Sequence, residues 1–571
     1  MIKNNKAVQL TLAHINDTHS YFEPHALQLQ LNIAGKSLSP YVSNGGFSRI
    51  ATRVKQLKSA AEEQQRGFLF LHAGDCFQGT LYFSLFKGKA NAEMLNALGI
   101  DMMTIGNHEL DMGNQPIADF LDRIKFPLLA GNWNLSNELT TKSHQLSNRD
   151  NLLSYQVAQK TAKWITREVN GEPIALFGLS IDKMMDIANV DPDTPFVNAI
   201  ETAINTVKAI QSLGINKIIL LSHLGYEGDK ELAKLVTGIS LIVGGHTHVL
   251  QGDFSDIGLK HEPEYGEYIN NTYIVQAGCH AQAIGHCHID FAKDGTVITF
   301  TGKNELLFGR RLCNEKSLLN TLDGELAIQA SAYLADHDNI VICKKDPLLQ
   351  SLLLDKYVPK VRKLQNTIIA TLPQDMRHIR IPDEKGGSEL VPLVAESFSY
   401  MMNKLGHQVD FAIHNAGGIR SSLNQGQISI ADIAGKLLPF MVPIGVYRIQ
   451  GKFISLALEG AINNATNNGV VGSGSGSYPY THNLAFTYCS ERPIGERITE
   501  LTIFNPDKGW IKVQAETFYH GTSSAYTMKG KEGYDALTMM QGEGTITQYS
   551  MADCFIDMIK QYPEKLNIKN Q

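Results

Sequence analysis

The chain has 571 residues, of which 43% are hydrophobic and 19% charged, a composition typical of folded globular proteins. This length exceeds that of one ordinary domain, so we expect at least two. The formal net charge of −6 excludes a broadly basic surface for nucleic acid, and the sequence has no apolar run long enough to predict a transmembrane helix.

The first residues, MIKNNKAVQLTLAHIND, lack the apolar core of a signal peptide and enter a strand pattern at once. The sequence as written therefore predicts a cytoplasmic protein, or a periplasmic or extracellular one if it is a trimmed mature form. Its 7 cysteines are scattered and include no CxxC pair, which argues against a disulfide framework.

The N-terminal half alternates predicted strands and helices. Val8 to Ile15 alternates apolar and polar residues like a strand, and Phe47 to Ala61 has the apolar spacing of a helix. Further strands are expected at 67–71, 100–105, 174–179, 218–221, 239–243, 273–277, 283–291 and 296–301, with helices around Met94, at 197–213 and at 231–236. This order predicts an α/β domain with largely parallel strands, whose carboxyl ends are where ligands collect.

Several of these strands end in residues that can bind a divalent metal. They are Asp17-x-His19, Gly74-Asp75, Gly106-Asn107-His108, Ser222-His223 and Gly244-Gly-His246-Thr-His248. Alone, each has an ordinary structural reading: Asp17 suits a turn, and Asn107 suits a helix cap followed by Glu109 and Asp111 in the first turn. Their joint occurrence at strand ends instead favours one shared metal site.

Residues beyond 345 follow a different pattern. Pro347 to Gln365 has the spacing of a long amphipathic helix, which predicts a helical connection at 346–365 between a first domain at 1–345 and a second at 366–571. The second domain mixes predicted helices (390–405 and 454–465) with strands (411–413, 445–449 and 498–503), which indicates α+β structure.

The set of candidate ligands suits phosphoryl transfer. Two divalent ions roughly 3.5–4 Å apart can clamp the attacking and leaving oxygens, and a water that they hold loses a proton near neutral pH. Such a site needs one bridging carboxylate, histidines and oxygens to complete both shells, and a further group that meets charge on the substrate.

These motifs resemble those of the calcineurin-like metallophosphatases, and nearly the whole chain resembles the two-domain 5′-nucleotidases. The resemblance implies a four-layer α/β/β/α sandwich, joined by the long helix to a smaller α+β substrate-binding domain. It also implies two divalent metal ions, Zn, Mn, Co or Fe. By the family pattern one ion would be held by Asp17, His19 and His248, the other by Asn107, His223 and His246, and Asp75 would bridge them. His108 would be the catalytic donor, oriented by Asp111.

The second-domain motifs resemble the family with more departures. His414-Asn415-Ala-Gly-Gly-Ile-Arg420 is similar to its Asn-Gly-Gly-Gly-x-Arg motif, which implies Asn415 facing the base and Arg420 holding phosphate. Phe440 would stack on the base, while Tyr526 and Glu532 replace the family's second stacking Phe and its ribose-binding Asp. Either Arg377 or Arg380 could supply a second phosphate-binding arginine.

The resemblance implies a hydrolase that releases phosphate from nucleoside 5′-monophosphates by attack of a bimetal-bound hydroxide, in nucleotide catabolism or salvage. The alternatives are a UDP-sugar or dinucleotide pyrophosphatase and a 2′,3′-cyclic nucleotide phosphodiesterase on the same site. A non-catalytic nucleotide-binding protein ranks last, because all the ligands and the His108–Asp111 pair are present. We expect a nucleotide substrate, no nucleic-acid partner and no membrane span; the oligomeric state is left open.

Overall fold

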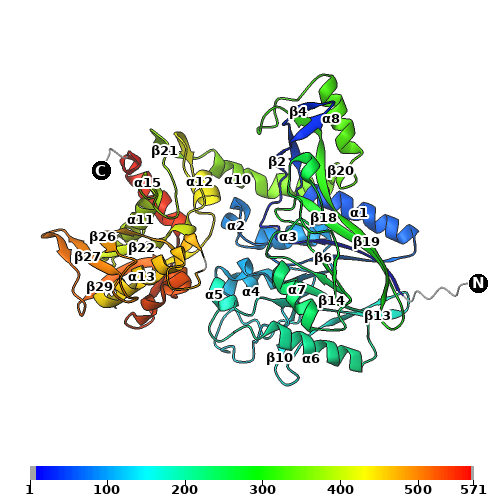
Figure 1. Ribbon diagram of the computed structural model, residues 1–571, viewed down its shortest axis with the longest axis horizontal. Coiled ribbons are helices and arrows are strands. Elements are labelled where there is room, and N and C mark those ends of the chain that lie inside the picture. The colour runs from blue at the N-terminus through cyan, green and yellow to red at the C-terminus, as the bar shows by residue number, and fades with distance from the viewer. Residues whose placement is uncertain (1–7, 473, 568–571) are drawn as a thin grey trace, which may run out of the picture. The chain divides into compact units, whose positions relative to one another are not determined.

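The computed structural model describes residues 8–472 and 474–567, which form mixed α/β structure (Figure 1). The chain divides into two compact units: unit 1 consists of Met1–Gln78 and Phe86–Val358, and unit 2 of Gly79–Leu85 and Pro359–Gln571. The helix expected at Pro347–Gln365 is present. It runs as α9 (Pro347–Leu352), a π-helical segment (Leu353–Tyr357) and α10 (Val358–Gln365), and the division between the units falls inside it.

Unit 1 contains two large sheets. Sheet 1 has the order β2 (His25–Gln28), β5 (Tyr41–Asn44), β19 (Val297–Cys313), β18 (Ala283–Phe291), β1 (Val8–Ile15), β6 (Gly67–His72), β7 (Met102–Thr104), β8 (Leu128–Leu129) and β9 (Leu152–Leu153), with β20 (Ile340–Ile342) beside β19. Sheet 2 has the order β12 (Ile165–Val169), β13 (Glu172–Ser180), β14 (Ile218–His223), β15 (Leu241–Val243), β17 (Thr272–Val275) and β16 (Glu267–Ile269). In sheet 1, β1, β6 and β7 are parallel; in sheet 2, β13, β14, β15 and β17 are parallel.

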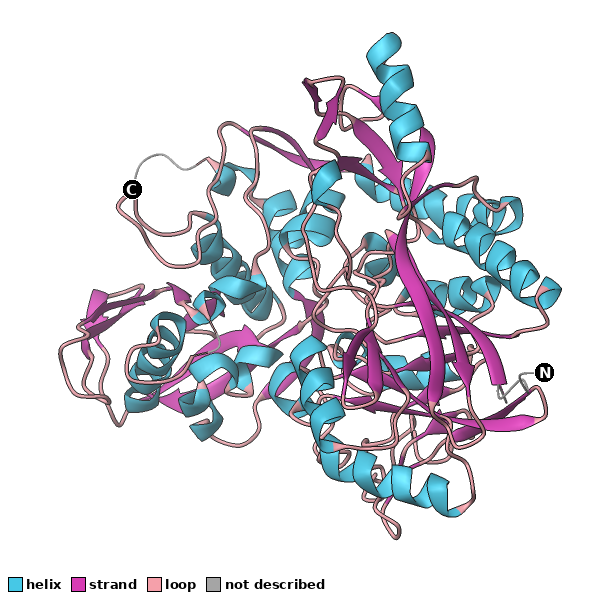
Figure 2. Ribbon diagram, turned by 45° about the vertical axis from the view of Figure 1, so that its right-hand side comes forward, coloured by secondary structure: helices cyan, strands magenta, loops and turns pink. Residues whose placement is uncertain are grey.

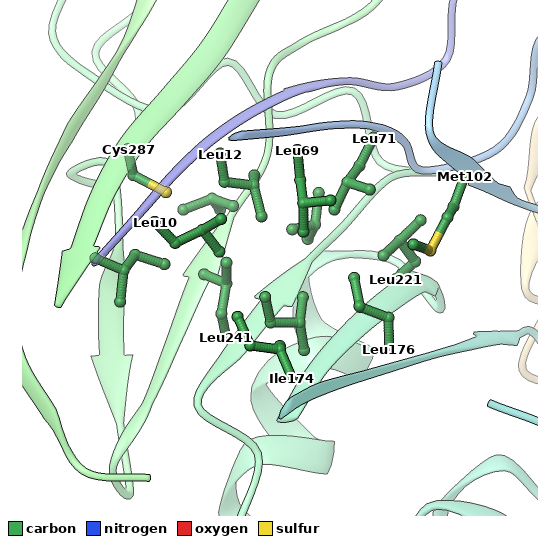
Figure 3. Packing of buried hydrophobic residues seen from close by; sticks show 14 of the residues in the cluster. Leu10, Leu12, Leu69, Leu71, Met102, Ile174, Leu176, Leu221, Leu241 and Cys287 are labelled. Carbon is green, nitrogen blue, oxygen red and sulfur yellow. The ribbon is translucent and has the colours of Figure 1, made fainter. Parts of the chain in front are cut away.

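The two sheets pack face to face over an apolar core. Side chains of sheet 1, among them Leu12 and Leu71, meet side chains of sheet 2, among them Leu176 and Leu221, and all four are fully buried (Figure 3). Each such leucine contributes about 1.5–3 kcal/mol by leaving water. Because side chains alternate across a strand, the same strands present a second row of residues to the outer faces.

Helices cover both outer faces, so that unit 1 is a four-layer α/β/β/α sandwich (Figures 1 and 2). On sheet 1, α1 (Phe47–Glu63) packs against β1 and β6, with Phe47, Ile50 and Val54 buried. On sheet 2, α6 (Ala199–Ser212) and α7 (Tyr226–Leu235) share a core with Phe177 and Leu220. The remaining helices and strands of unit 1 are α3 (Lys89–Leu98), α4 (Gln115–Leu121), α5 (Met184–Ile187), α8 (Glu325–Ala335), β3 (Leu31–Ile33), β4 (Lys36–Leu38), β10 (Tyr155–Gln156) and β11 (Thr161–Ala162), while α2 (Leu81–Phe86) belongs almost wholly to unit 2.

Two elements of unit 1 are longer than the sequence predicted. The strand expected at 296–301 continues to Cys313 as β19, through buried Asn304 and Glu305 whose side chains are held by hydrogen bonds and ion pairs. The helix expected at 231–236 begins earlier, as α7 at Tyr226, where the sequence has no apolar periodicity. Buried polar residues, Asn304 and Glu305 in β19 and Asp229 in α7, thus conceal both extensions.

Unit 2 is built around a mixed sheet with the order β25 (Pro479–His482), β22 (Phe411–Asn415), β29 (Phe518–Ser524), β24 (Pro443–Gln450) and β30 (Thr545–Ser550). Its core joins Phe411 and Ile449 of this sheet to Ile454 and Leu458 of α13 (Gly451–Thr466), while α11 (Leu390–Lys404) packs against β22 and β25. Smaller elements are β21 (Ile368–Leu372), β23 (Gly426–Ser429), β26 (Leu484–Tyr488), β27 (Ile498–Asn505), β28 (Gly509–Lys512), α12 (Ile430–Asp432), α14 (Ala525–Met528) and α15 (Met551–Gln561).

Candidate active site

The strand ends singled out in the sequence meet at one edge of the sandwich. Each predicted metal ligand in unit 1 ends one of the parallel strands β1, β6, β7, β14 and β15 or lies in the loop that follows it. Seven residues are concerned, and all of them come together there: Asp17, His19, Asp75, Asn107, His223, His246 and His248. Parallel strands place their carboxyl ends at the same edge of a sheet, which is why residues far apart in sequence converge.

These residues form two clusters that suit metal binding. In cluster A (Asp17, His19 and His248) and in cluster B (Asp75, His223 and His246), the ligand atoms of each trio lie within 4.8 Å of one another. Asn107 adjoins cluster B, with its Oδ1 2.9 Å from Nδ1 of His246. The clusters adjoin at Gly245, where an added Cβ would lie 3.0 Å from His223 Nδ1 and 3.1 Å from Asp17 Oδ2.

Two of the histidines are fixed in the orientation that metal ligation requires. His19 Nδ1 lies 3.1 Å from the carbonyl of Phe77, and His223 Nδ1 lies 2.7 Å from the carbonyl of Ala73. Since a carbonyl accepts, each Nδ1 carries the proton, and Nε2 is left for a cation. The two Nε2 atoms of His19 and His248 face each other at 3.2 Å, an arrangement that a shared cation would stabilise.

The charges in the clusters are strongly coupled. Burial raises the pKa of Asp75, but the neighbouring imidazoles of His223 and His108 outweigh it and hold that pKa well below its ordinary value. Burial lowers the pKa of His223, but the Asp75 carboxylate raises it to about 10. The Asp75 carboxylate therefore remains ionised and stabilises positive charge beside it. This is the electrostatic requirement for holding divalent cations in a buried site.

The backbone of the ligand loops is strained. Asp17, His19, Asp75, His246 and His248 all have positive φ, between 46° and 75°. Such a conformation costs a non-glycine residue on the order of 1–3 kcal/mol and persists only where the surroundings enforce it. The gathering of these five residues at one edge of the sheets makes that edge a candidate functional site.

Glu109 is buried and binds the backbone of two ligand loops, those that contain Asp75 and Asn107. The sequence suggested for it only a place in a helix turn. Its carboxylate accepts the backbone N–H groups of Asp75 (2.9 Å), Cys76 (2.7 Å), Phe77 (3.0 Å) and Gly106 (2.7 Å). The cap reading of Asn107 is not supported, since its side chain makes no capping hydrogen bond to the 3₁₀ turn His108–Leu110. No sequence pattern signals a carboxylate that binds backbone amides.

His108 lies beside the clusters and is paired with Asp111. His108 Nδ1 is 2.7 Å from Asp111 Oδ2, its backbone N–H donates to Asp75 Oδ1 (2.9 Å), and its ring centroid is 5.2 Å from that of His19. Burial lowers the pKa of His108, but the carboxylates of Asp111 and Asp75 raise it to about 9. The ring is therefore protonated at neutral pH and can donate a proton or a charged hydrogen bond.

In unit 2, the predicted nucleotide-binding residues form two contacts. Asn415, the last residue of β22, donates from Nδ2 to Glu532 Oε2 at 3.2 Å, and the Arg420 guanidinium lies 5.2 Å over the ring of Phe440. Tyr526 is in α14, which follows β29 and contacts the short helix that contains Glu532. Since β22 and β29 are parallel, Asn415 and Tyr526 leave the sheet at the same edge.

The two candidate arginines for phosphate differ in their surroundings. Arg377 is already engaged, with Nη1 2.8 Å from Asp383 and Nη2 2.9 Å from the carbonyl of Gly386. Arg380 is exposed and lies near Arg420: burial and the Arg380 charge together lower the pKa of Arg420. A second positive charge near Arg420 would suit an anion, which makes Arg380 the better candidate of the two.

Both halves of the chain match known family models. Residues 10–250 match calcineurin-like phosphoesterases, and residues 368–539 match the 5′-nucleotidase C-terminal domain. Unit 1 is therefore a metallophosphatase, a class of enzyme that uses divalent metal ions. Among the described residues, no helix has the length and apolar character needed to cross a membrane.

The full chain has relatives over nearly its whole length. It is 30% identical to an NAD 5′-nucleotidase of Haemophilus influenzae, over 98% of this chain and 91% of the relative, and 30% identical to a probable 5′-nucleotidase of Treponema pallidum, over 93% and 87%. The solved structure of a 5′-nucleotidase precursor from Thermus thermophilus superposes with a TM-score of 0.67 at 27% identity, over 97% of this chain and 96% of that one. The chain belongs to the two-domain 5′-nucleotidase family of phosphoric monoester hydrolases.

Proposed function

We propose that this protein hydrolyses nucleoside 5′-monophosphates to nucleoside and phosphate. The observation that carries the proposal is the pair of ligand clusters beside the His108–Asp111 pair. When bound, two divalent ions would supply Lewis-acid charge for the phosphoryl group and a deprotonated water as nucleophile. Imidazole and carboxylate donors suit Zn, Mn, Co or Fe.

In this proposal the site residues of unit 1 either hold metal or assist the chemical step. Cluster A (Asp17, His19 and His248) would hold one ion and cluster B, with Asn107, the other, while Asp75 would bridge them. His108 would donate to the phosphoryl or leaving oxygen as charge develops there, and Asp111 would orient its ring.

The residues of unit 2 would recognise the nucleotide. Arg420 and Arg380 would bind phosphate, Phe440 and Tyr526 would stack on the base, and Asn415 with Glu532 would bind the base and ribose hydroxyls. Stacking of a base on an aromatic ring is worth roughly 1–3 kcal/mol. Glu532 is one methylene longer than the family's aspartate, and its carboxylate accepts a hydrogen bond from Asn415 at 3.2 Å.

A second candidate is hydrolysis of a dinucleotide pyrophosphate. The similarity to an NAD 5′-nucleotidase favours it, because the same metal clusters could cleave either bond. The two functions are distinguished by their products: a monophosphate releases inorganic phosphate, whereas NAD cleaved at its pyrophosphate gives two mononucleotides first.

A panel of substrates tests both functions. Purified protein, freed of metal and reloaded with Mn²⁺, Co²⁺ or Zn²⁺, is incubated with AMP, 3′-AMP, 2′,3′-cyclic AMP, UDP-glucose and NAD, and phosphate, nucleoside and nucleotide products are quantified. We expect equal release of phosphate and adenosine from AMP. Turnover of UDP-glucose, NAD or the cyclic nucleotide without turnover of AMP would replace the proposal by one of its alternatives, and no turnover with any metal would contradict it.

A further inference from the structure

The loop Gly244–Val249 carries one member of each metal-binding cluster. His246 belongs to cluster B and His248 to cluster A, so this short segment sets the position of ligands on both sides of the site. Both histidines have positive φ, 75° and 60°, an uncommon conformation for L-residues that neighbouring contacts can stabilise.

One buried side chain amide, that of Gln276, binds this loop from beneath. Its Nε2 donates to the carbonyl of Gly245 (2.7 Å), and its Oε1 accepts both the Thr247 hydroxyl (3.1 Å) and the Val249 backbone N–H (2.6 Å). Gln276 is fully buried and directly follows β17, the neighbour of β15 in sheet 2. Three alternate residues of the loop thus bind one amide.

This alternation determines where the histidines point. With residues 245, 247 and 249 held on the Gln276 side, residues 246 and 248 are the ones whose side chains are left for the two clusters. Gln276 is itself fixed at both backbone atoms: its N–H donates to Gln251 Oε1 (2.8 Å), and its carbonyl accepts Asn304 Nδ2 (2.8 Å). An amide held so firmly can impose a conformation on the loop.

We infer that Gln276 is a positioning residue that fixes His246 and His248 together, and thereby sets the affinity of both metal positions. The inference rests on the proposed function only in taking these histidines as metal ligands. A neighbour of this kind typically changes metal affinity by 10–100-fold when it is removed. Because one amide holds the loop that supplies both clusters, its removal weakens the binding of both ions.

Direct metal binding tests the inference. Gln276→Leu removes the amide at similar volume, and Gln276→Glu keeps an acceptor for Val249 but replaces the donor to Gly245. The matched control is Asn132→Leu, which removes another fully buried amide with backbone partners, at Ser180 (2.7 Å) and Val197 (3.1 Å), outside the clusters. Binding of Mn²⁺ to the metal-free proteins is measured by titration calorimetry, and stability by urea unfolding in the presence of chelator.

We expect Gln276→Leu to weaken Mn²⁺ binding at both sites by at least about 10-fold, and Asn132→Leu to bind as the wild type does even where its loss of stability is equal. The Mn²⁺ affinity of Gln276→Glu should lie between those of these two variants. This variant replaces Gln276→Leu in the test if the leucine variant does not fold. Wild-type affinity in the Gln276 variants, or an equal loss in Asn132→Leu, would overturn the inference.

The proposed function can fail separately. A wild-type chain that binds two Mn²⁺ ions and hydrolyses no nucleotide contradicts the proposed function alone, and the comparison of variants still decides the role of Gln276. A wild-type chain that binds no Mn²⁺ at millimolar concentration overturns both.

Discussion

The Nδ1 atom of His108 lies 2.7 Å from Oδ2 of Asp111, and this contact fixes the orientation of the imidazole. With Nδ1 engaged by the carboxylate, Nε2 is the atom available for donation. The three-residue spacing places both side chains on one side of the 3₁₀ turn His108–Leu110. The pair thus combines orientation with a raised pKa, the two properties that a general acid requires.

Removing the imidazole should abolish most of the turnover and leave metal binding intact. We expect His108→Ala to lower kcat by about 10²–10⁴-fold, the usual contribution of a positioned acid, because no cluster ligand is altered. Steady-state kinetics with AMP and metal analysis of the purified variant check this. His261→Ala, which removes an exposed histidine (72% exposed) outside the clusters, is the control and should be active. Near-normal kcat in His108→Ala would contradict the assignment.

Removing the orienting carboxylate should have a smaller effect of the same kind. Asp111→Asn keeps the size of the side chain but loses the charge that raises the pKa of His108, so we expect kcat to fall by about 10–100-fold, a part of the full acid contribution. In the double variant with His108→Ala, the further loss should nearly vanish, because Asp111 acts through His108. Additive losses would show that Asp111 has a separate role.

Glu109 should couple the stability of the ligand loops to metal binding. Glu109→Gln exchanges an acceptor for an NH₂ group opposite backbone N–H donors, and hydrogen bonds to a charged group contribute about 1.5–3 kcal/mol each. We expect a lower free energy of unfolding and weaker Mn²⁺ binding. Glu138→Gln is the control: Glu138 also accepts backbone N–H groups, from Leu146 (2.9 Å) and Ser147 (2.8 Å), but outside the clusters. The Glu138→Gln variant should have a lower free energy of unfolding and an unchanged Mn²⁺ affinity. If Glu109→Gln also keeps its Mn²⁺ affinity, a role of Glu109 in metal binding is refuted.

Substitutions of Arg380 and of Arg377 should have different effects on KM for AMP. If Arg380 binds phosphate beside Arg420, Arg380→Ala should raise KM for AMP by roughly 10-fold or more, the equivalent of one charge-assisted hydrogen bond. Arg377→Ala breaks the contact with Asp383 and should change KM much less. Initial rates over a range of AMP concentrations decide the question, and a reversed order of effects would assign the phosphate site to Arg377.

The loss of stability of unit 1 at acid pH should depend on Glu305. Burial raises the pKa of this carboxyl, but the nearby His286 imidazole and the hydrogen bonds from Arg53 outweigh it and lower the pKa from 4.5 to about 2. Because the folded-state pKa is depressed, the ionised carboxylate stabilises the fold above about pH 4.5, and that stabilisation is lost as the pH falls toward 2.

Glu305→Gln should therefore lower the free energy of unfolding by about 2–4 kcal/mol at pH 7, with a deficit that shrinks below pH 4.5. Urea unfolding from pH 7 to pH 3 measures this. Glu315→Gln, at an exposed position, should show no such pH-dependent deficit. A deficit for Glu305→Gln that is constant with pH would exclude the electrostatic cause.

Much of the fold and of the candidate site could be predicted, for identifiable reasons. The strand β1 alternates so regularly that its bounds, Val8–Ile15, were predicted correctly, and parallel strands oblige Asp17, Asp75 and His223 to converge. The roles of Glu109 and Gln276 could not be predicted, because a side chain that binds backbone N–H and carbonyl groups leaves no pattern in the sequence. The full length of β19 was concealed by Asn304 and Glu305, which are polar yet buried.

The two clusters draw their members from both sheets. Cluster A takes His19 from the end of β1 in sheet 1 and His248 from the end of β15 in sheet 2, side chains separated by 229 residues of chain. A cation bound there would consequently also be a cross-link, because it would join the two layers in addition to the hydrogen bonds that already link them at this edge, such as that of His223 with the carbonyl of Ala73. Metal concentration would then affect stability as well as turnover, because bound ions stabilise the folded sandwich by mass action and chelation removes that stabilisation.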